Sequence, residues 1–223
     1  MRPLTPADEA RVTEAVVAAE RLSDGEIVTI VAPRSDGYAD IAWLWSILIM
    51  FLALAVYAGW PRFYQGLIGH LLGWSAPSTT RGIMLLLFVA LVAKLFGMRL
   101  ILLWRPLLLA LTPPATKAHR VRARAIDLFR VSVESRTRAK TGVLLYLSLA
   151  ERRAEIVADA GIHGRVAPEE WGEAMAVLVG HLRERCPGEG MAAAVERIGK
   201  VLATHFPRSP DDTDELPDRL IQL

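Results

Sequence analysis

The segment IAWLWSILIMFLALAVYA, residues 41–58, contains no charged residue and determines how the rest of the chain is interpreted. As a helix that rises about 1.5 Å per residue, it is long enough to cross the roughly 30 Å hydrocarbon core of a bilayer. A second apolar run, residues 83–104, follows after a linker. We therefore expect a two-helix transmembrane hairpin.

The second run is less uniform, because it contains Lys94 and Arg99. A charge near the bilayer centre costs at least a few kcal/mol, so these side chains must snorkel, pair or lie outside the hydrocarbon. We favour a helix from about residue 82 that reaches the interface near Lys94 or Arg99, with an interfacial stretch from Arg105. A functional intramembrane charge is the alternative, and a transport role would require an oligomer and a task for Lys94.

The composition separates an apolar part from a charged part. Hydrophobic residues make up 52% and charged residues 22% of the 223 residues, and the two runs contain no charged residue apart from Lys94 and Arg99. A net charge of +2 gives no reason to expect nucleic acid as a partner, and the single cysteine, Cys186, excludes an internal disulfide. The expected partners are the lipid bilayer and other membrane proteins.

The remaining sequence alternates between helical and strand patterns. The predicted elements are a helix over residues 5–22, a strand over 26–31, a basic helix after 114, a strand over 142–149, its hairpin partner over 154–160, and two helices from about 168 and 188. The predicted organisation is a first helix and strand over residues 1–40, a hairpin insertion over 41–112, the rest of the domain over 113–206, and an acidic, proline-containing tail, extended or disordered, over 207–223.

Basic residues cluster after the second run. They are Arg120, Arg122, Arg124, Arg130, Arg136, Arg138 and Lys140. A solvated helix face and attraction to anionic lipid, at about 1 kcal/mol per cation, are both open interpretations. Because the linker between the runs carries only Arg62 and Arg81, the positive-inside rule places both termini in the cytoplasm of a bacterial inner membrane.

The stretch RTRAKTGVLLYLSLAERRAEIVADAGIHGRVAPEEWGEAM, residues 136–175, resembles the TPM domain, a family named for thylakoid-lumen, photosystem-repair and receptor-modulator members. The resemblance implies an α/β fold in which a small mixed sheet lies between helices. It also implies one of several activities, because family members include acid phosphatases, calcium-binding proteins and factors for assembly or repair of membrane complexes. The hairpin, inserted after the first strand, departs from the basic domain.

Carboxylates near the end of the 154–160 strand are the best candidates for chemistry. Asp159 is a candidate phosphatase nucleophile or base, and Asp159, Glu169 and Glu170 could hold calcium or magnesium through oxygen ligands. Gly161 and His163 lie in the loop between them. The structural alternatives are that Asp159 ends a strand and that both glutamates favour the first turn of a helix.

Three further residues have a functional and a structural interpretation. Arg152 and Arg153 could grip a phosphate or a partner carboxylate, or simply keep a hairpin loop polar. Trp171 falls on an apolar helix face, which favours a place in the core over ligand stacking. The sequence thus favours a membrane-tethered interaction or assembly module. The alternative is a metal-dependent phosphomonoester hydrolase.

Overall fold

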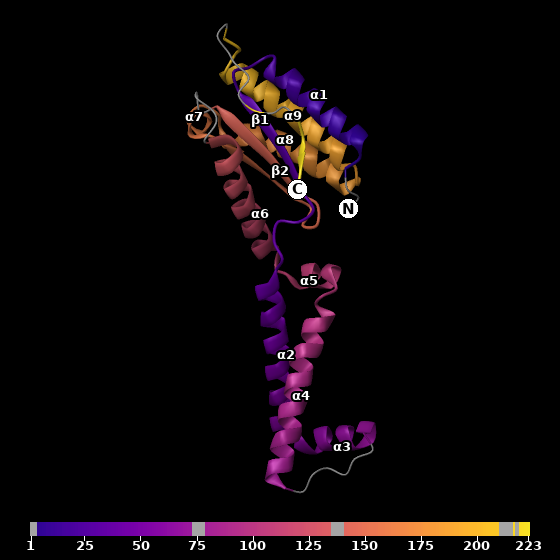
Figure 1. Ribbon diagram of the computed structural model, residues 1–223. Helices are drawn as coiled ribbons and strands as arrows, with labels where there is room; N and C mark the ends of the chain where they lie inside the picture. The colour runs from indigo at the N-terminus through magenta and orange to yellow at the C-terminus, as the bar shows by residue number, and fades with distance from the viewer. Residues whose placement is uncertain (1–3, 73–78, 135–140, 210–215, 217–218) are drawn as a thin grey trace. The chain divides into compact units, whose positions relative to one another are not determined.

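The computed structural model of the chain describes residues 4–72, 79–134, 141–209, 216 and 219–223. It consists of two compact units, one formed by Gly37–Pro113 and the other by Met1–Asp36 together with Pro114–Leu223 (Figure 1). Arg136, Arg138, Lys140, and the acidic part of the tail over residues 210–215 lie outside the described residues.

The discontinuous unit contains a four-stranded mixed sheet in the order β3-β2-β1-β4. The strands are β1 (Glu26–Ala32), β2 (Gly142–Ser148), β3 (Arg153–Ala158) and β4 (Ile221–Gln222). β1 runs parallel to β2, from Glu26 opposite Gly142 to Ala32 opposite Ser148, and β3 is antiparallel to β2. The predicted small mixed sheet is confirmed.

Helices cover both faces of this sheet. They are α1 (Pro6–Glu20), α6 (Pro114–Phe129), the short α7 (Ala160–His163), α8 (Pro168–Arg183) and α9 (Pro187–His205). Figure 1 shows α1, α8 and α9 on one side of the sheet and α6, which continues as a π-helical turn (Arg130–Glu134), on the other. Both β1 and β2 are buried along their whole length, as expected for central strands with two apolar faces.

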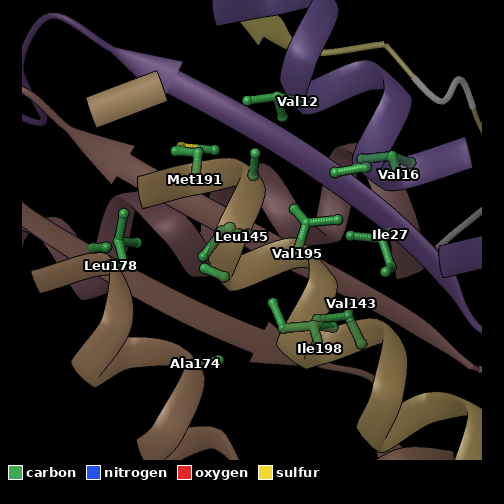
Figure 2. Close-up of a cluster of buried hydrophobic side chains, with 14 of the residues drawn as sticks. Val12, Val16, Ile27, Val143, Leu145, Ala174, Leu178, Met191, Val195 and Ile198 are labelled. Atoms are coloured by element: carbon green, nitrogen blue, oxygen red, sulfur yellow. The ribbon is translucent and has the colours of Figure 1, made fainter. Parts of the chain in front are cut away.

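The larger core lies between the sheet and the α1, α8 and α9 layer. Figure 2 shows its side chains converging from these elements, among them Val16, Leu145, Leu178 and Val195. α1 and α9 approach closely: a Cβ atom added at Gly199 would lie 2.5 Å from the Cβ of Ala19. Glycine is therefore required at this helix crossing.

The α1 helix begins as the sequence predicts. The Thr5 hydroxyl accepts from the backbone N–H of Asp8 at 3.2 Å, and the Asp8 carboxylate accepts from the backbone N–H of Thr5 at 2.9 Å. These reciprocal bonds form a capping box, with Pro6 in the first turn. They satisfy two backbone donors that the helix itself leaves free.

The other unit contains α2 (Ala39–Gly59), α3 (Pro61–Leu72), α4 (Thr80–Ile101) and α5 (Arg105–Leu111). α2 and α4 pack against each other, and both are long and apolar enough to cross a membrane. Only 11% of the most apolar window of α2 and none of that of α4 is buried. They are therefore not core helices within the chain.

A small core stabilises the end of the hairpin at which α2 begins and α4 ends. Tyr38, Ala42, Leu102 and Leu108 are buried there. Trp45 Nε1 donates to the carbonyl of Leu111 at 3.2 Å, which attaches the end of α5 to α2.

Two arginines also lie at this end. Arg99, in the last turn of α4, places its guanidinium 5.6 Å from the ring centroid of Trp43. Arg105, the first residue of α5, donates to the carbonyl of Gly37 at 2.9 Å. α4 continues past Arg99 to Ile101, and the predicted stretch from Arg105 is the separate helix α5.

The structure corrects one sequence prediction and decides between the two alternatives of another. The strand expected to reach Ala160 ends at Ala158, because the Asp159 carboxylate accepts from the backbone N–H of Ala160 and starts α7. The end of the tail is extended but not disordered. It forms β4, which pairs in parallel with Ile30 and Val31 of β1.

Candidate functional site

Four polar residues gather where β1 and β2 end. Because these strands are parallel and in register, both carboxyl ends lie at one edge of the sheet, where ligands bind in many α/β folds. Ser35 follows β1, Tyr146 and Ser148 belong to β2, and Glu151 lies in the turn between β2 and β3. We call these four residues the polar cluster.

Hydrogen bonds connect all four members of the polar cluster. Glu151 Oε1 accepts from the backbone N–H of Ser35 at 3.1 Å, and Oε2 accepts from the Ser148 hydroxyl. The hydroxyls of Ser35 and Tyr146 are 3.0 Å apart and form a further bond. The carboxylate thus attaches the segment after β1 to the β2–β3 turn.

The polar cluster is largely closed to solvent. Tyr146 and Ser148 are 0% exposed and Glu151 is 8% exposed. Burial raises the pKa of the Tyr146 phenol, and hydrogen bonds with Ser35 and Ser148 partly oppose that shift. The Ser148 hydroxyl is occupied as a donor and inaccessible to a substrate, so the arrangement fixes a loop and does not present a nucleophile.

Substitution Glu151→Ala is expected to destabilise the chain by about 2 kcal/mol, because it leaves the Ser35 N–H and the Ser148 hydroxyl without their acceptor. Denaturant unfolding in detergent measures this loss. Exposed Glu173, 3.7 Å from Arg197, is the matched control. Its Glu173→Ala variant is expected to change stability by less than about 1 kcal/mol. Equal effects of the two variants would contradict the assigned role of Glu151.

Charged side chains surround the polar cluster. Arg120 Nε lies 3.2 Å from Asp36 Oδ2, and Arg122 Nη1 lies 3.9 Å from Glu155 Oε2. Burial raises the pKa of Glu155, while the positive charges of Arg122 and Arg153 act to lower it. The raised pKa means that ionisation of Glu155 is less favourable in the folded chain than in the unfolded chain.

This raised pKa predicts how the stability of the chain depends on pH. A group with a raised folded pKa contributes stability below its unfolded pKa, and that contribution is lost as the pH rises through the folded pKa. Substitution Glu155→Gln is therefore expected to raise the melting temperature relative to the parent at about pH 7, with the gain shrinking towards about pH 4. Melting curves across this range measure it. A gain that grows as the pH falls would contradict the prediction.

Asp159, the predicted catalytic residue, lies immediately after β3. It is buried, its backbone N–H donates to the carbonyl of Gly142 at 2.9 Å, and its carboxylate caps α7 at 2.7 Å. Gly161 and His163 are in the single turn of α7 and are exposed. These contacts give Asp159 a structural position between β3 and α7.

The two glutamates lie in the first turn of α8. Glu169 is exposed, and Glu170 Oε2 lies 3.0 Å from His205 Nε2. The hydrogen bond with His205 lowers the pKa of Glu170. Among the residues that the structure describes, no three His, Cys, Asp or Glu side chains gather as metal ligands. The structure thus does not bring Asp159, Glu169 and Glu170 together, and a calcium or magnesium site at these residues stays a prediction.

The other predicted residues are dispersed. Arg152 is exposed at the β2–β3 turn, Arg153 begins β3, and Trp171 packs partly buried against the larger core. Lys94 is exposed on α4, one and a half turns before Arg99. The structure thus brings Arg152 and Arg153 near the polar cluster, while Lys94 and Arg99 belong to the hairpin unit.

The polar cluster was not predicted from the sequence. One signal was visible: Tyr146 and Ser148 are two polar positions on one face of a strand that is otherwise apolar. Their partner Ser35 could not be identified, because it is 116 residues from Glu151 in the sequence.

Comparison with known proteins gives one family and one fold. Residues 108–201 match the model of the TPM domain family. No curated protein matches the chain in sequence. The structure is similar to the NMR structure of BA42 protein from the psychrophilic bacterium Bizionia argentinensis, with a TM-score of 0.58 and 18% identity over 99% of this chain and 96% of that one. At this identity the likeness concerns the fold alone.

Proposed function

The chain contains a TPM domain over residues 108–201, and we propose that it is an integral membrane protein which uses this domain to dock onto another membrane protein. In this proposal α2 and α4 cross a bacterial inner membrane and the domain lies on the cytoplasmic side. The TPM domain acts there as an interaction or assembly module.

The observation that carries the proposal is the way the domain holds the segment that leads into the hairpin. Glu151 binds Ser35, and Arg120 pairs with Asp36, the last residue of the discontinuous unit. After Gly37 the chain enters two apolar helices that are largely exposed. The domain thus holds the segment before the hairpin by hydrogen bonds and an ion pair, and the apolar helices of the hairpin are not buried within the chain. Together these two features favour a domain that is anchored to a membrane.

The distribution of charge supports the cytoplasmic side. Arg99 and Arg105 lie at the end of the hairpin where the chain connects to the TPM domain, and Lys117 and Arg120 follow within two turns of α6. The other end carries only Arg62 and Arg81 among the described lysine and arginine residues. Such an excess of cations is typical of cytoplasmic flanks.

The choice of docking over catalysis rests on how the polar groups are used. The buried Ser148 hydroxyl donates to Glu151, and the buried Asp159 carboxylate caps α7. Each has a structural partner within the domain, whereas a hydrolase needs a nucleophile within reach of its substrate.

Photo-crosslinking in native membranes tests this function. Two separate variants each carry the photo-crosslinking residue benzoylphenylalanine in place of one exposed side chain. One variant replaces Val131, after α6, and the other replaces Leu22, after α1. We expect one discrete membrane protein to be captured from one position and not from the other, because a docking domain uses one face. Capture from neither position, or metal-dependent hydrolysis of a generic phosphomonoester that is lost in Asp159→Asn, would overturn the proposal.

A further inference from the structure

We propose that Arg34, Arg122, Arg124 and Arg152 form a surface that binds anionic lipid headgroups. We call these four residues the basic rim. This proposal rests on the proposed membrane anchorage through α2 and α4. It adds a second contact with the membrane, in which the domain itself binds anionic headgroups.

The first step is that the polar cluster brings Arg34 and Arg152 together. The backbone N–H of Ala150 donates to the carbonyl of Pro33 at 3.0 Å, and Glu151 accepts from the backbone N–H of Ser35. Arg34 and Arg152 are the direct neighbours of these bonded residues, and both are exposed. Two segments far apart in the sequence thus present cations at one edge of the sheet.

The second step adds the arginines of α6. Arg122 lies 3.9 Å from Glu155, which stands opposite Tyr146 in the β2–β3 ladder. Arg124 is close enough to Tyr146 for its charge to act on the phenol. The Arg122 side chain is 72% exposed, and Arg124 is exposed as well. The basic rim therefore combines two arginines of α6 with one from each of the loops that follow β1 and β2.

The third step compares the two signs of charge in this region. The cations on or next to the bonded and ion-paired residues are Arg34, Arg120, Arg122, Arg152 and Arg153, and the carboxylates are Asp36, Glu151 and Glu155. Five against three leaves an excess of two positive charges, and on α6 the exposed Arg124 is accompanied by the exposed Asp127. Near a membrane surface, each such cation contributes about 1 kcal/mol of attraction to anionic lipid.

The fourth step is the backbone of Arg152. Its φ is 52°, in the left-handed region, where glycine is favoured and a side chain adds strain. Glycine at this position would therefore remove the positive charge and relieve the backbone strain at once. In the sequence, Arg34 lies three residues before Gly37, the first residue of the hairpin unit.

The test compares the full chain in nanodiscs of phosphatidylcholine alone and with about 30% phosphatidylglycerol. Hydrogen exchange of peptides covering residues 33–36 and 149–155 is the readout. We expect exchange at least about threefold slower with the anionic lipid. This protection should disappear at about 1 M salt, where the Debye length falls to roughly 3 Å.

Variants separate lipid binding from stability. The pair Arg34→Gln with Arg152→Gly should lose the lipid-dependent protection, while Arg152→Gly alone should raise the melting temperature by relieving the left-handed conformation. Arg185 is the matched control, because it is exposed, has φ 64° and lies between α8 and α9. Arg185→Gly should stabilise similarly and keep the protection.

Three results would count against these ideas in different ways. Equal exchange in both kinds of disc overturns the lipid surface, and so does an equal loss of protection in Arg185→Gly and in the rim pair. Failure of the parent chain to elute with the discs overturns the membrane anchorage, which is the earlier proposal.

Discussion

Replacing Leu48 and Phe51 by arginine is expected to release the chain from the carbonate-resistant membrane fraction. Both residues lie near the middle of α2, and both side chains are exposed within the structure. An arginine at the centre of a membrane helix costs about 2.5–3.5 kcal/mol on insertion scales, and each lost apolar residue adds about 0.5 kcal/mol. The double variant therefore costs about 6–8 kcal/mol.

Sodium carbonate extraction of membranes, followed by detection of the chain in pellet and supernatant, measures this effect. The matched control is Leu22→Arg, because Leu22 is also an exposed apolar residue but lies outside the hairpin unit. The control should stay in the pellet with the parent. If the double variant also stayed in the pellet, α2 would not be a membrane span.

Substitution Gly199→Leu is expected to destabilise the discontinuous unit by more than about 3 kcal/mol. A Cβ at this position would lie 2.5 Å from the Cβ and 3.1 Å from the Cα of Ala19. The second atom belongs to the backbone of α1, so the two helices must separate for the leucine to fit. Separation loosens the larger core, in which Val16 and Val195 lie between these helices and the sheet (Figure 2).

Gly172→Leu provides a control of opposite sign. Gly172 is exposed in the middle of α8, and a Cβ there meets no atom within 4 Å. Leucine should stabilise the helix by roughly 0.5–1 kcal/mol, because glycine is a poor helix former. Unfolding in detergent compares the two variants, and destabilisation of similar size in both would contradict the packing argument.

Local patterns allowed much of the fold to be predicted. Three signals depend only on residues that are close in the sequence, and they can therefore be recognised without the structure. They are the Thr5 cap, the β-branched residues of β1 and the apolar run of β2. The predicted end of β3 was wrong. The strand was expected to continue to Ala160, but Asp159 caps the helical turn α7. β4 was missed because it depends on pairing with Ile30 and Val31, which no local pattern encodes.

The candidate site was less accessible to prediction for the same reason. Asp159 was predicted as a site residue because carboxylates near a glycine-containing loop often serve as ligands. A carboxylate that accepts a hydrogen bond at a helix cap gives the same sequence pattern. The polar cluster joins Ser35 to Glu151 across the whole hairpin insertion. Only the parallel register of β1 and β2 brings these residues together, and the sequence alone does not show that register.

The pairing of β1 with β2 has a consequence for the synthesis of the protein. β1 emerges from the ribosome before the hairpin, and β2 emerges only after residues 33–141 have been made. The apolar faces of β1 therefore stay without this partner strand until the intervening segment has been made. In the proposed membrane protein, α2 and α4 would be available for insertion into the bilayer before the sheet can close.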